Sequence, residues 1–445
     1  MNPMNLPEAF RSRMKEQLGD EYEAFISRYN NPPIRGLRIN TLRLSKEEFL
    51  KLCPWKVKQA DTLYEGLILD EEVPHIGTDP YHIAGLIYMQ EPSAMSVIEH
   101  ADIGPGMRVL DLCAAPGGKS GGIAARLNGS GFLLSNEIVP SRAKLLCQNL
   151  ERLGVMNSAV TCAHPDEIAS VLPCYFDRVI VDAPCSGEGM FRKDPAAIAE
   201  WSPEAVDACA LRQKAILESA AKLVSENGKL IYSTCTFSKQ ENEDVIEAFL
   251  SAHPEFVIDY MKRYYPHTCR GEGHFAARLT KRGGSSGAFK AFKPAIGKES
   301  ARLVKDFIAE TFSSFPGGMG FHESKSGSIC FLPSEIPDNL FKLRVLSFGI
   351  PVGEIVKNRL KPHHALFMAS GELHEFGYEC RNRINLGRNS SELLRFLSGN
   401  TIDIPQSLRG YCAVTADGFP VGFGKAVDGV LKNHLPKGLA VAAYR

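Results

Sequence analysis

Two cysteines each follow directly on an apolar run of the kind found in buried strands. Residues 178–182 lead into Cys185 through an Ala-Pro turn, and residues 229–233 lead into Cys235 through one threonine. The proline, and a glycine two residues after Cys185, end the first strand in a tight loop that keeps Asp182 beside the thiol. Neighbouring strands lie about 4.8 Å apart, so two such loops would bring both thiols to one pocket. Taken alone, the first segment is equally consistent with a strand–loop junction that buries a cysteine by chance.

A second group of residues is typical of a site for an adenosine-type cofactor. Residues 111–120 combine the end of a strand, a glycine-rich turn and the start of a small-residue helix. Gly117 and Gly118 let backbone amides approach a ligand without an intervening side chain. Glu137 closes the next strand, where it can accept hydrogen bonds from a ribose diol. Neither the dinucleotide-binding nor the P-loop glycine spacing is present, which disfavours NAD and nucleoside triphosphates. A glycine turn that serves packing alone is the alternative.

Two thiols beside a methyl donor suit methylation at C5 of a pyrimidine. That carbon is too electron-poor to attack a methyl sulfonium, but a thiolate added at C6 turns it into a nucleophilic enamine carbon. A resting cysteine pKa of about 8.5 leaves little thiolate at neutral pH, so Lys119 or local backbone amides are expected to stabilise the anion. The second thiol would assist product release, and an acid near N3 and the exocyclic amine would favour cytosine. The base must be unstacked or single-stranded to be reached.

Length and composition place the chain among ordinary globular proteins. Its 445 residues predict about two to four domains, with 44% hydrophobic and 23% charged residues. No run reaches about 18 uninterrupted apolar residues, so we expect a cytoplasmic location and no membrane association. The twelve cysteines contain no CxxC pair, which fits neither a zinc ribbon nor a secreted disulfide scaffold, and no metal site is expected.

The order of strand and helix signals predicts four parts. Residues 1–75 read as a small α+β module with two short helices and a strand at 35–43, whose Arg35, Arg38 and Arg43 would be available to solvent or phosphate. Strand–helix repeats over 76–298 predict a mainly parallel, doubly wound sheet covered by helices. One of these helices begins at a Ser-Pro-Glu cap at 202–204 and would end at Gly228. Two smaller parts follow, at about 301–372 and 373–445.

The charge distribution favours an anionic partner. Residues 1–250 carry 25 Lys/Arg and 34 Asp/Glu, whereas residues 251–445 carry 26 and 17, although the whole chain is neutral. Residues 262–298 hold nine Lys/Arg, with Glu272 as the only acid among them and aromatic residues interleaved. Such a mixture suits a phosphate backbone with stackable bases, so we predict that nucleic acid binds here. A solvated surface is the alternative.

Three motifs in order resemble the signatures of the Nop/Sun family of RNA cytosine-5 methyltransferases. They are Asp111-Leu-Cys-Ala-Ala-Pro-Gly-Gly-Lys119, Asp182-Ala-Pro-Cys-Ser-Gly187 and Ser233-Thr-Cys-Thr236. Outside them, residues 35–43 resemble the N-terminal module of that family, residues 271–275 its last sheet hairpin, and residues 432–437 a PUA-like C-terminal domain. The resemblance covers nearly the whole chain. It implies a Rossmann-like catalytic domain between an RNA-binding α+β module and a PUA-like RNA-binding domain.

The resemblance also implies roles for individual residues. Cys235 would be the nucleophile that forms the covalent adduct, Cys185 would help to release the product, and Asp182 would lie near the base. S-adenosylmethionine would be held by a set drawn from all three strand ends: Cys113, Ala114, Ala115, Pro116, Gly117, Gly118, Lys119, Glu137, Arg142 and Asp182. Where relatives place an acid against the adenine, this chain has Ala-His-Pro-Asp ending at Asp166, and residues 437–440 lack an arginine that relatives often carry.

The implied partner is RNA, with small-subunit ribosomal RNA or the small ribosomal subunit favoured as substrate and the enzyme acting as a monomer. The same chemistry on transfer RNA stays open, because PUA-like domains serve both substrates. A ribosome-assembly factor that binds RNA without methylating it would need neither Cys185 nor Cys235. An amino-methyltransferase would carry an Asn/Asp-Pro-Pro-aromatic loop in place of residues 182–185.

Overall fold

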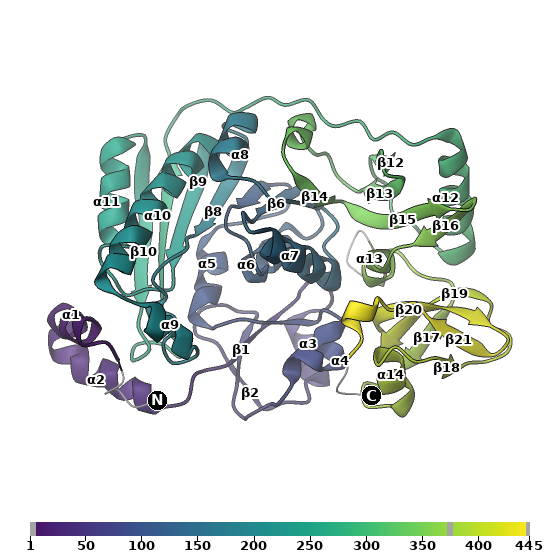
Figure 1. Cartoon of the computed structure of the whole chain (residues 1–445), viewed down its shortest axis with the longest axis horizontal. Coiled ribbons are helices and arrows are strands. Elements are labelled where there is room, and N and C mark those ends of the chain that lie inside the picture. Colours follow the sequence, from purple (N-terminus) through teal and green to yellow (C-terminus); the bar gives the residue numbers. More distant parts are fainter. Residues whose placement is uncertain (1–5, 372–376, 442–445) are drawn as a thin grey trace.

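The computed structural model describes residues 6–371 and 377–441, and four β-sheets organise them. In Figure 1 the largest sheet and its helices occupy the upper left and centre, and a second sheet with α12 lies at the upper right. The N-terminal elements lie along the bottom, beside the C-terminal sheet at the lower right. Among the described helices, none combines the length and apolarity that a membrane crossing requires.

The largest sheet has eight strands in the order β10-β11-β9-β8-β5-β6-β7-β14. Its five central strands, from β9 to β7, are parallel, and antiparallel strands close both edges. The order of the strands along the chain reverses between β5 and β8, which is where doubly wound sheets bind ligands at their carboxyl ends. The strands are β5 (Arg108–Asp111), β6 (Phe132–Asn136), β7 (Ser158–Thr161), β8 (Phe176–Asp182), β9 (Val224–Thr234), β10 (Phe256–Tyr264), β11 (His274–Lys281) and β14 (Val345–Phe348).

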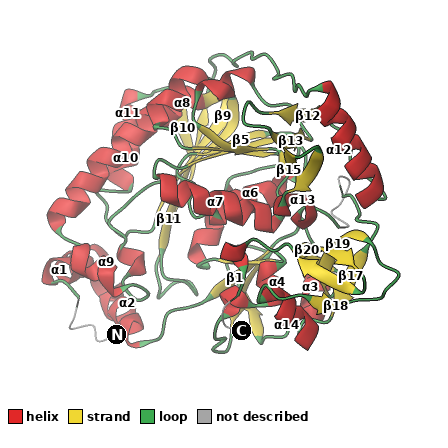
Figure 2. Ribbon diagram, turned by 45° about the vertical axis from the view of Figure 1, so that its right-hand side comes forward, coloured by secondary structure: helices red, strands yellow, loops and turns green. Residues whose placement is uncertain are grey.

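Helices cover both faces of this sheet because its central strands are apolar on both sides. In β8, Val179 and Val181 pack in one core cluster with residues of α8, α10 and α11, whereas Ile180 packs in another with residues of α5, α6 and α7. Figure 2 shows the strands of the sheet lying behind α6 and α7. The helices are α5 (Ser96–His100), α6 (Gly118–Leu127), α7 (Pro140–Leu153), α8 (Pro165–Val171), α9 (Pro195–Glu200), α10 (Pro203–Leu223) and α11 (Glu243–Ala252).

The N-terminal part forms a four-stranded antiparallel sheet, in the order β2-β3-β1-β4, preceded by two helices. The helix pair α1 and α2 packs Phe10 and Phe25 against Phe191 and Phe237, which lie in the loops after Cys185 and Cys235. The elements are α1 (Glu8–Leu18), α2 (Tyr22–Ser27), β1 (Gly36–Ile39), α3 (Lys46–Leu52), β2 (Val57–Gln59), β3 (Gly66–Leu69), α4 (Pro80–Ile83) and β4 (Ile87–Met89).

The C-terminal half forms two further sheets. The first has its strands in the order β12-β13-β15-β16 and is flanked by two helices, α12 (Lys298–Thr311) and α13 (His364–Met368). Its strands are β12 (Gly320–Glu323), β13 (Ser328–Leu332), β15 (Ile350–Val356) and β16 (Arg359–Pro362). The second, in the order β17-β19-β20-β21-β18, contains β17 (Arg383–Leu386), α14 (Ser391–Leu397), β18 (Ile402–Asp403), β19 (Gly410–Ala416), β20 (Phe419–Val427) and β21 (Val430–Asn433). This last sheet shares a core cluster with the N-terminal sheet, so the two ends of the chain meet.

The doubly wound sheet expected from the sequence is confirmed. Most of its strands and helices begin and end within a few residues of the positions expected from the sequence. The long helix begins at its Ser202 cap, whose hydroxyl accepts a hydrogen bond from the Ala205 amide, but it ends at Leu223 instead of Gly228. There the chain enters β9 with Val224 in the main core. Strand β4 pairs with β1, so the N-terminal sheet extends beyond residue 75, and β14 joins the large sheet from the following part. The boundary expected at 372/373 lies outside the described residues.

Two arginines on β1 and just after it are not available to solvent or phosphate, which corrects the prediction from the sequence. Arg38 is 2% exposed and Arg43 is 5% exposed. The Arg43 guanidinium donates to the main-chain carbonyls of Met368 and Ser370 in the C-terminal half. Only Arg35 of the three is exposed.

Candidate active site

The two thiols predicted to converge lie side by side. Asp182 at the end of β8 pairs in register with Ser233 of β9, so the loops that follow these strands leave the sheet together. The sulfur atoms of Cys185 and Cys235 are 3.3 Å apart. The neighbouring Cys235 and burial raise the pKa of the Cys185 thiol well above its ordinary value. Cys185 is therefore a neutral thiol at physiological pH in this arrangement.

A buried carboxylate holds the two thiol loops together. The Glu241 carboxylate accepts hydrogen bonds from the Ser186 amide at 2.8 Å, from the Thr236 hydroxyl at 3.1 Å and from the Gln213 side chain at 3.1 Å. Ser186 follows Cys185 and Thr236 follows Cys235 in the chain. Burial raises the pKa of Glu241 above its ordinary value. Sequence reasoning missed Glu241 because its partners come together only in the folded chain.

A second buried carboxylate, Glu188, connects the same loops to the N-terminal helices. Its oxygens accept hydrogen bonds from the Phe237 amide and the Trp201 indole, both at 2.9 Å, and pair with the guanidinium of Arg13 in α1. The N-terminal helix pair therefore supports the position of both thiols. The sequence carried no signal for this contact, since 175 residues separate Arg13 from Glu188.

Asp182 lies in a polar cluster next to the thiol loops. One of its carboxylate oxygens is 2.6 Å from the Lys119 ammonium, and the other accepts a hydrogen bond from the Ser233 hydroxyl at 2.8 Å. Burial opposes ionisation, but Lys119 and then His274 hold the pKa of Asp182 below its ordinary value. Lys119, which together with local backbone amides was a candidate to stabilise a thiolate, forms an ion pair with Asp182. The cluster presents an ionised carboxylate beside the thiol loops.

The buried imidazole of His274 completes this cluster. Its Nε2 atom is 3.8 Å from Asp182, and neither ring nitrogen has a hydrogen-bond partner among the described residues. Burial and the nearby Lys119 lower the pKa of His274 to about 4, so the ring is neutral. The motif quoted from residues 271–275 contained His274, but no spacing in the sequence linked it to Asp182.

The glycine-rich turn after β5 is fixed from the N-terminal sheet. Arg38 donates a hydrogen bond to the Gln90 side chain at 2.7 Å and another to the main-chain carbonyl of Gly118. A Cβ atom at Gly121 or Gly122 of α6 would come within 2.8 Å of the Arg38 guanidinium, so only glycine leaves room for it. Burial lowers the pKa of Arg38 to about 10, and it stays charged at neutral pH. Arg38 therefore sets the position of a turn that the sequence assigned to the cofactor.

The remaining predicted cofactor residues border the same turn. Glu137, 4% exposed at the end of β6, accepts a hydrogen bond from the Val139 amide at 2.9 Å and lies 3.4 Å from the Arg142 guanidinium. Arg142 also donates to the Ala115 carbonyl at 2.9 Å. Cys113, within the turn, has a pKa raised by burial and by Asp111. The ten predicted residues thus lie at the carboxyl ends of β5, β6 and β8 or on the helices that follow.

The carboxyl groups around the turn fit S-adenosylmethionine. Asp111 at the end of β5 is fully buried, and one of its carboxylate oxygens has no hydrogen-bond partner among the described residues. Burial raises the pKa of Asp111 to about 7. Three carboxyl groups, from Asp111, Glu137 and Asp182, therefore border one turn, which suits a ligand with a ribose diol and a positive sulfonium. Asp166, by contrast, is exposed and hydrogen-bonds to Ser219 of α10.

Fold and site together define a Rossmann-like, S-adenosylmethionine-dependent methyltransferase with a C-terminal PUA domain. Family models match all four parts: 16S rRNA methyltransferase RsmB/F at residues 102–280, the N-terminal domain of 16S rRNA methyltransferase RsmF at 6–92, the RsmF rRNA methyltransferase first C-terminal domain at 306–369 and the methyltransferase RsmF PUA domain at 383–441.

Full-length relatives agree with these matches. The chain is 31% identical to the ribosomal RNA small subunit methyltransferase F of Salmonella paratyphi A, over 97% of this chain and 96% of that one. It is 30% identical to the enzyme of the same name from Pectobacterium atrosepticum, over 98% and 96%. A solved methyltransferase homolog protein from Pyrococcus horikoshii is 27% identical with a TM-score of 0.56, covering 62% of this chain and 95% of that one. The chain belongs to the ribosomal RNA small subunit methyltransferase F family.

Proposed function

We propose that this enzyme methylates C5 of cytosine in small-subunit ribosomal RNA through a covalent bond between Cys235 and C6 of the base. The observation that carries the proposal is the 3.3 Å separation of two thiols at the edge of the sheet that also bears the cofactor turn. A single buried cysteine can be explained by packing, but two at the tips of adjacent strands suit a reaction that forms and then breaks a bond to sulfur.

The covalent step follows from the chemistry of the pyrimidine ring. The Cys235 thiolate adds to C6, and the electron pair moves to C5, which then bonds to the methyl group. S-adenosylmethionine would supply that methyl group and leave as S-adenosylhomocysteine. The C5 proton then passes to a base from solvent, its bonding pair re-forms the C5–C6 double bond, and the Cys235 sulfur leaves C6 as a thiolate, which restores the aromatic ring. Cys185, in contact with Cys235, assists this release and keeps the enzyme from remaining attached to the RNA.

Asp182 gives the site its preference for cytosine. Its pKa is held below the ordinary value, so it is an ionised acceptor, and the exocyclic amine of cytosine is a donor that uracil lacks. Lys119 and Ser233 fix the carboxylate through both of its oxygens. A carboxylate fixed in this way can receive the amine without first having to be oriented.

We further propose that the parts flanking residues 76–298 hold the RNA while the base enters the site. The N-terminal module contacts both thiol loops through Glu188, so RNA bound to this module would lie close to the reacting base. The PUA domain at 383–441 gives a second RNA-binding surface. A base reached in this way must be unstacked, as in other enzymes that act on a single base.

Mapping 5-methylcytosine in total RNA from cells with and without this protein tests the proposal. A methylated cytosine in 16S ribosomal RNA that disappears with the protein is the expected result. Loss of the mark from transfer RNA alone would reassign the substrate. An unchanged pattern in all RNA would overturn the proposal.

A further inference from the structure

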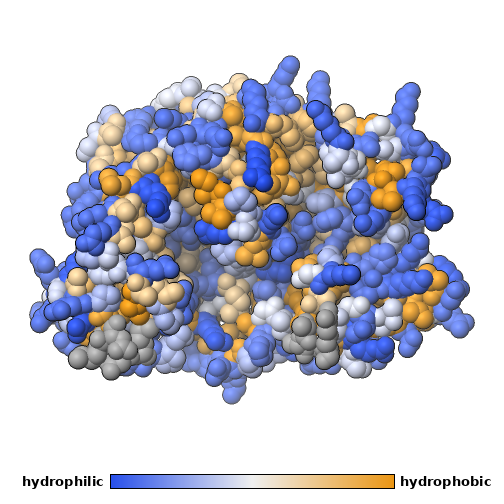
Figure 3. Space-filling view, viewed as in Figure 1, coloured by the Kyte–Doolittle hydropathy of each residue, from blue (hydrophilic) through white to orange (hydrophobic). Residues whose placement is uncertain are grey.

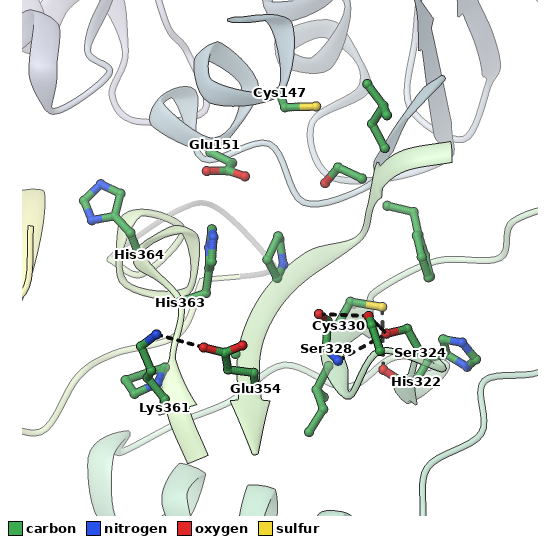
Figure 4. Close-up of a pocket in the computed structure, with 18 of the residues that line it drawn as sticks. Cys147, Glu151, His322, Ser324, Ser328, Cys330, Glu354, Lys361, His363 and His364 are labelled. Carbon is green, nitrogen blue, oxygen red and sulfur yellow. Dashed lines mark hydrogen bonds and ion pairs between the residues drawn. The ribbon is translucent and has the colours of Figure 1, made fainter. Parts of the chain in front are cut away.

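A cavity of about 780 Å³ lies away from the thiols, where three parts of the chain meet. Its walls come from α7 and β14 of the large sheet, from β13, β15 and β16, and from the PUA domain through Phe423 and His434. Figure 4 shows α7 above the cavity and the strands of the smaller sheet below it. The cavity is of the size that small-molecule sites occupy. It exists only because the C-terminal parts dock on the catalytic sheet.

The cavity has a wall of flat rings. The rings that remain partly or fully exposed are those of His322 and Phe348, whose centroids lie 5.9 Å apart, and that of His434. Phe423, 5.3 Å from His434, is 2% exposed and stacks on Phe367, so it supports this wall from behind. Burial lowers the pKa of His322 and of His434, so both rings are neutral at physiological pH. Flat neutral rings are the surfaces on which RNA-binding proteins stack unpaired bases.

Two polar groups in the wall lack partners among the described residues. The Glu151 carboxyl on α7 makes no hydrogen bond or ion pair there, and burial alone raises its pKa to about 7. His364, 8% exposed, has an unpaired Nδ1 atom. Figure 4 shows the Glu151 carboxyl and the His363 ring pointing toward one another across the space. A polar group without a hydrogen-bond partner at a cavity wall is unfavourable for the protein, and a ligand that donates a hydrogen bond to it would remove that cost.

The charges in the cavity argue against a phosphate as the recognised group. The one lysine among the described lining residues, Lys361, is paired with Glu354 at 2.8 Å, as the dashed line in Figure 4 marks. Glu151 adds a carboxyl that no described cation neutralises. An anion would therefore be repelled, whereas a neutral ring with N–H donors would be favoured.

We propose that this cavity binds an unstacked guanine base, with the Glu151 carboxylate accepting hydrogen bonds from N1–H and from the exocyclic amine. The ionised form of Glu151, which predominates above its pKa of about 7, offers only acceptors, and guanine is the one common RNA base whose pairing edge presents two adjacent donors. Adenine and cytosine each present a donor beside an acceptor, and uracil has a single N–H. The inference does not rest on the cytosine chemistry proposed above, since it concerns another part of the molecule.

Equilibrium binding of the uncharged nucleosides guanosine, inosine and adenosine to the full chain tests this site. The cofactor site is first saturated with S-adenosylhomocysteine, so that purine binding there does not contribute. Inosine lacks the exocyclic amine and should bind about fivefold more weakly than guanosine, the value of one hydrogen bond. Adenosine should bind about tenfold more weakly or worse. Glu151→Gln should remove the preference, whereas Glu354→Gln, which changes a lining carboxylate already paired with Lys361, should keep it.

Equal affinities for guanosine, inosine and adenosine, or a guanosine-to-inosine ratio that Glu151→Gln leaves unchanged, would overturn the proposal. A competition arm identifies the source of the base. If a 16S RNA fragment with unpaired guanines displaces guanosine, the base belongs to RNA. If guanosine stays bound beside the RNA, the ligand is a free guanine nucleoside. Either result supports guanine as the recognised chemistry.

Discussion

The ammonium of Lys119 lies 2.6 Å from a carboxylate oxygen of Asp182, which joins the turn after β5 to the end of β8. The two strands are adjacent and parallel, so the contact follows from the strand order. It connects the residues assigned to the cofactor with the acid assigned to the base. A charge pair at this point makes the ionisation of Asp182 depend on the cofactor turn.

Lys119→Met should move the acid limb of activity to higher pH. In the wild type the pKa of Asp182 is held below its ordinary value, so the carboxylate is lost only as pH falls through that low value. Without Lys119, burial dominates and raises the pKa of Asp182. The profile of kcat/KM against pH measures the shift. Lys119→Arg keeps the positive charge and should keep the wild-type profile. If the acid limb lies at the same pH in the wild type and both variants, Lys119 does not control the ionisation of Asp182.

Cys235→Ala should abolish methylation while the affinity for S-adenosylmethionine stays within about threefold, because the sulfur is assigned to the base and not to the cofactor. Methyl transfer to 16S RNA and calorimetric titration of the cofactor measure the two quantities separately. Residual turnover above about one per cent of the wild type would show that another group forms the adduct.

Cys185→Ala should trap the covalent complex. If Cys185 assists departure of the Cys235 sulfur, its removal leaves RNA attached to the protein after the methyl group has been transferred. A denaturing gel with labelled RNA detects this species. Cys53→Ala, which removes a thiol from the N-terminal module, is the matched control and should give no adduct. A gel without adduct for Cys185→Ala would contradict the two-thiol scheme.

The convergence of the thiols was predictable because it depends on strand order alone. Each cysteine follows a strand of the same parallel sheet, and neighbouring strands end at one edge. The residues that hold them were not predictable. Glu188 acts through Arg13 and Phe237, and Glu241 acts through Ser186 and Thr236, contacts that no periodicity of the chain encodes.

The error at Arg38 has a physical reason. Alternation of basic and apolar residues at 35–43 indicated a strand with one wet face, yet all four residues of β1 are buried. The face that carries Arg38 is covered by the glycine-rich turn and α6 of the catalytic domain. The alternation of polar and apolar residues depends only on the sequence of the strand itself. It does not indicate which other parts of the chain cover the polar face.

Arg38→Met should lower both stability and cofactor affinity. The substitution leaves the Gly118 carbonyl and the Gln90 side chain without their buried donor, at a cost of about 1–3 kcal/mol in the free energy of unfolding. The turn would also lose its anchor, so S-adenosylmethionine should bind more weakly. Denaturant unfolding and cofactor titration measure the two effects. Arg35→Met changes an exposed arginine on the same segment and should alter neither. Equal effects of both substitutions would show that Arg38 has no special role.

The basic segment at 262–298 is less free than its composition indicated. Three of its arginines pair with acids elsewhere in the chain, and Lys281 is buried against the Val224 carbonyl. The pairs are Arg263 with Glu243, Arg270 with Asp61, and Arg278 with Asp259. Lys262 on β10 stays exposed, and so does the connection from β11 to α12, which crosses the top of the molecule in Figure 1, where hydrophilic side chains project in Figure 3.

Removing two exposed lysines of that connection should therefore flatten the salt dependence of RNA binding. If Lys290 and Lys293 contact phosphates, changing both to alanine lowers the slope of log affinity against log salt by about 0.7 for each contact with single-stranded RNA. Filter binding or anisotropy from 50 to about 300 mM salt measures the slope. Lys214 and Lys222, exposed on α10, provide a control that removes the same charge from another surface. If both double variants reduce the slope equally, the connection is not a specific RNA contact, and the charge of the whole molecule accounts for the effect.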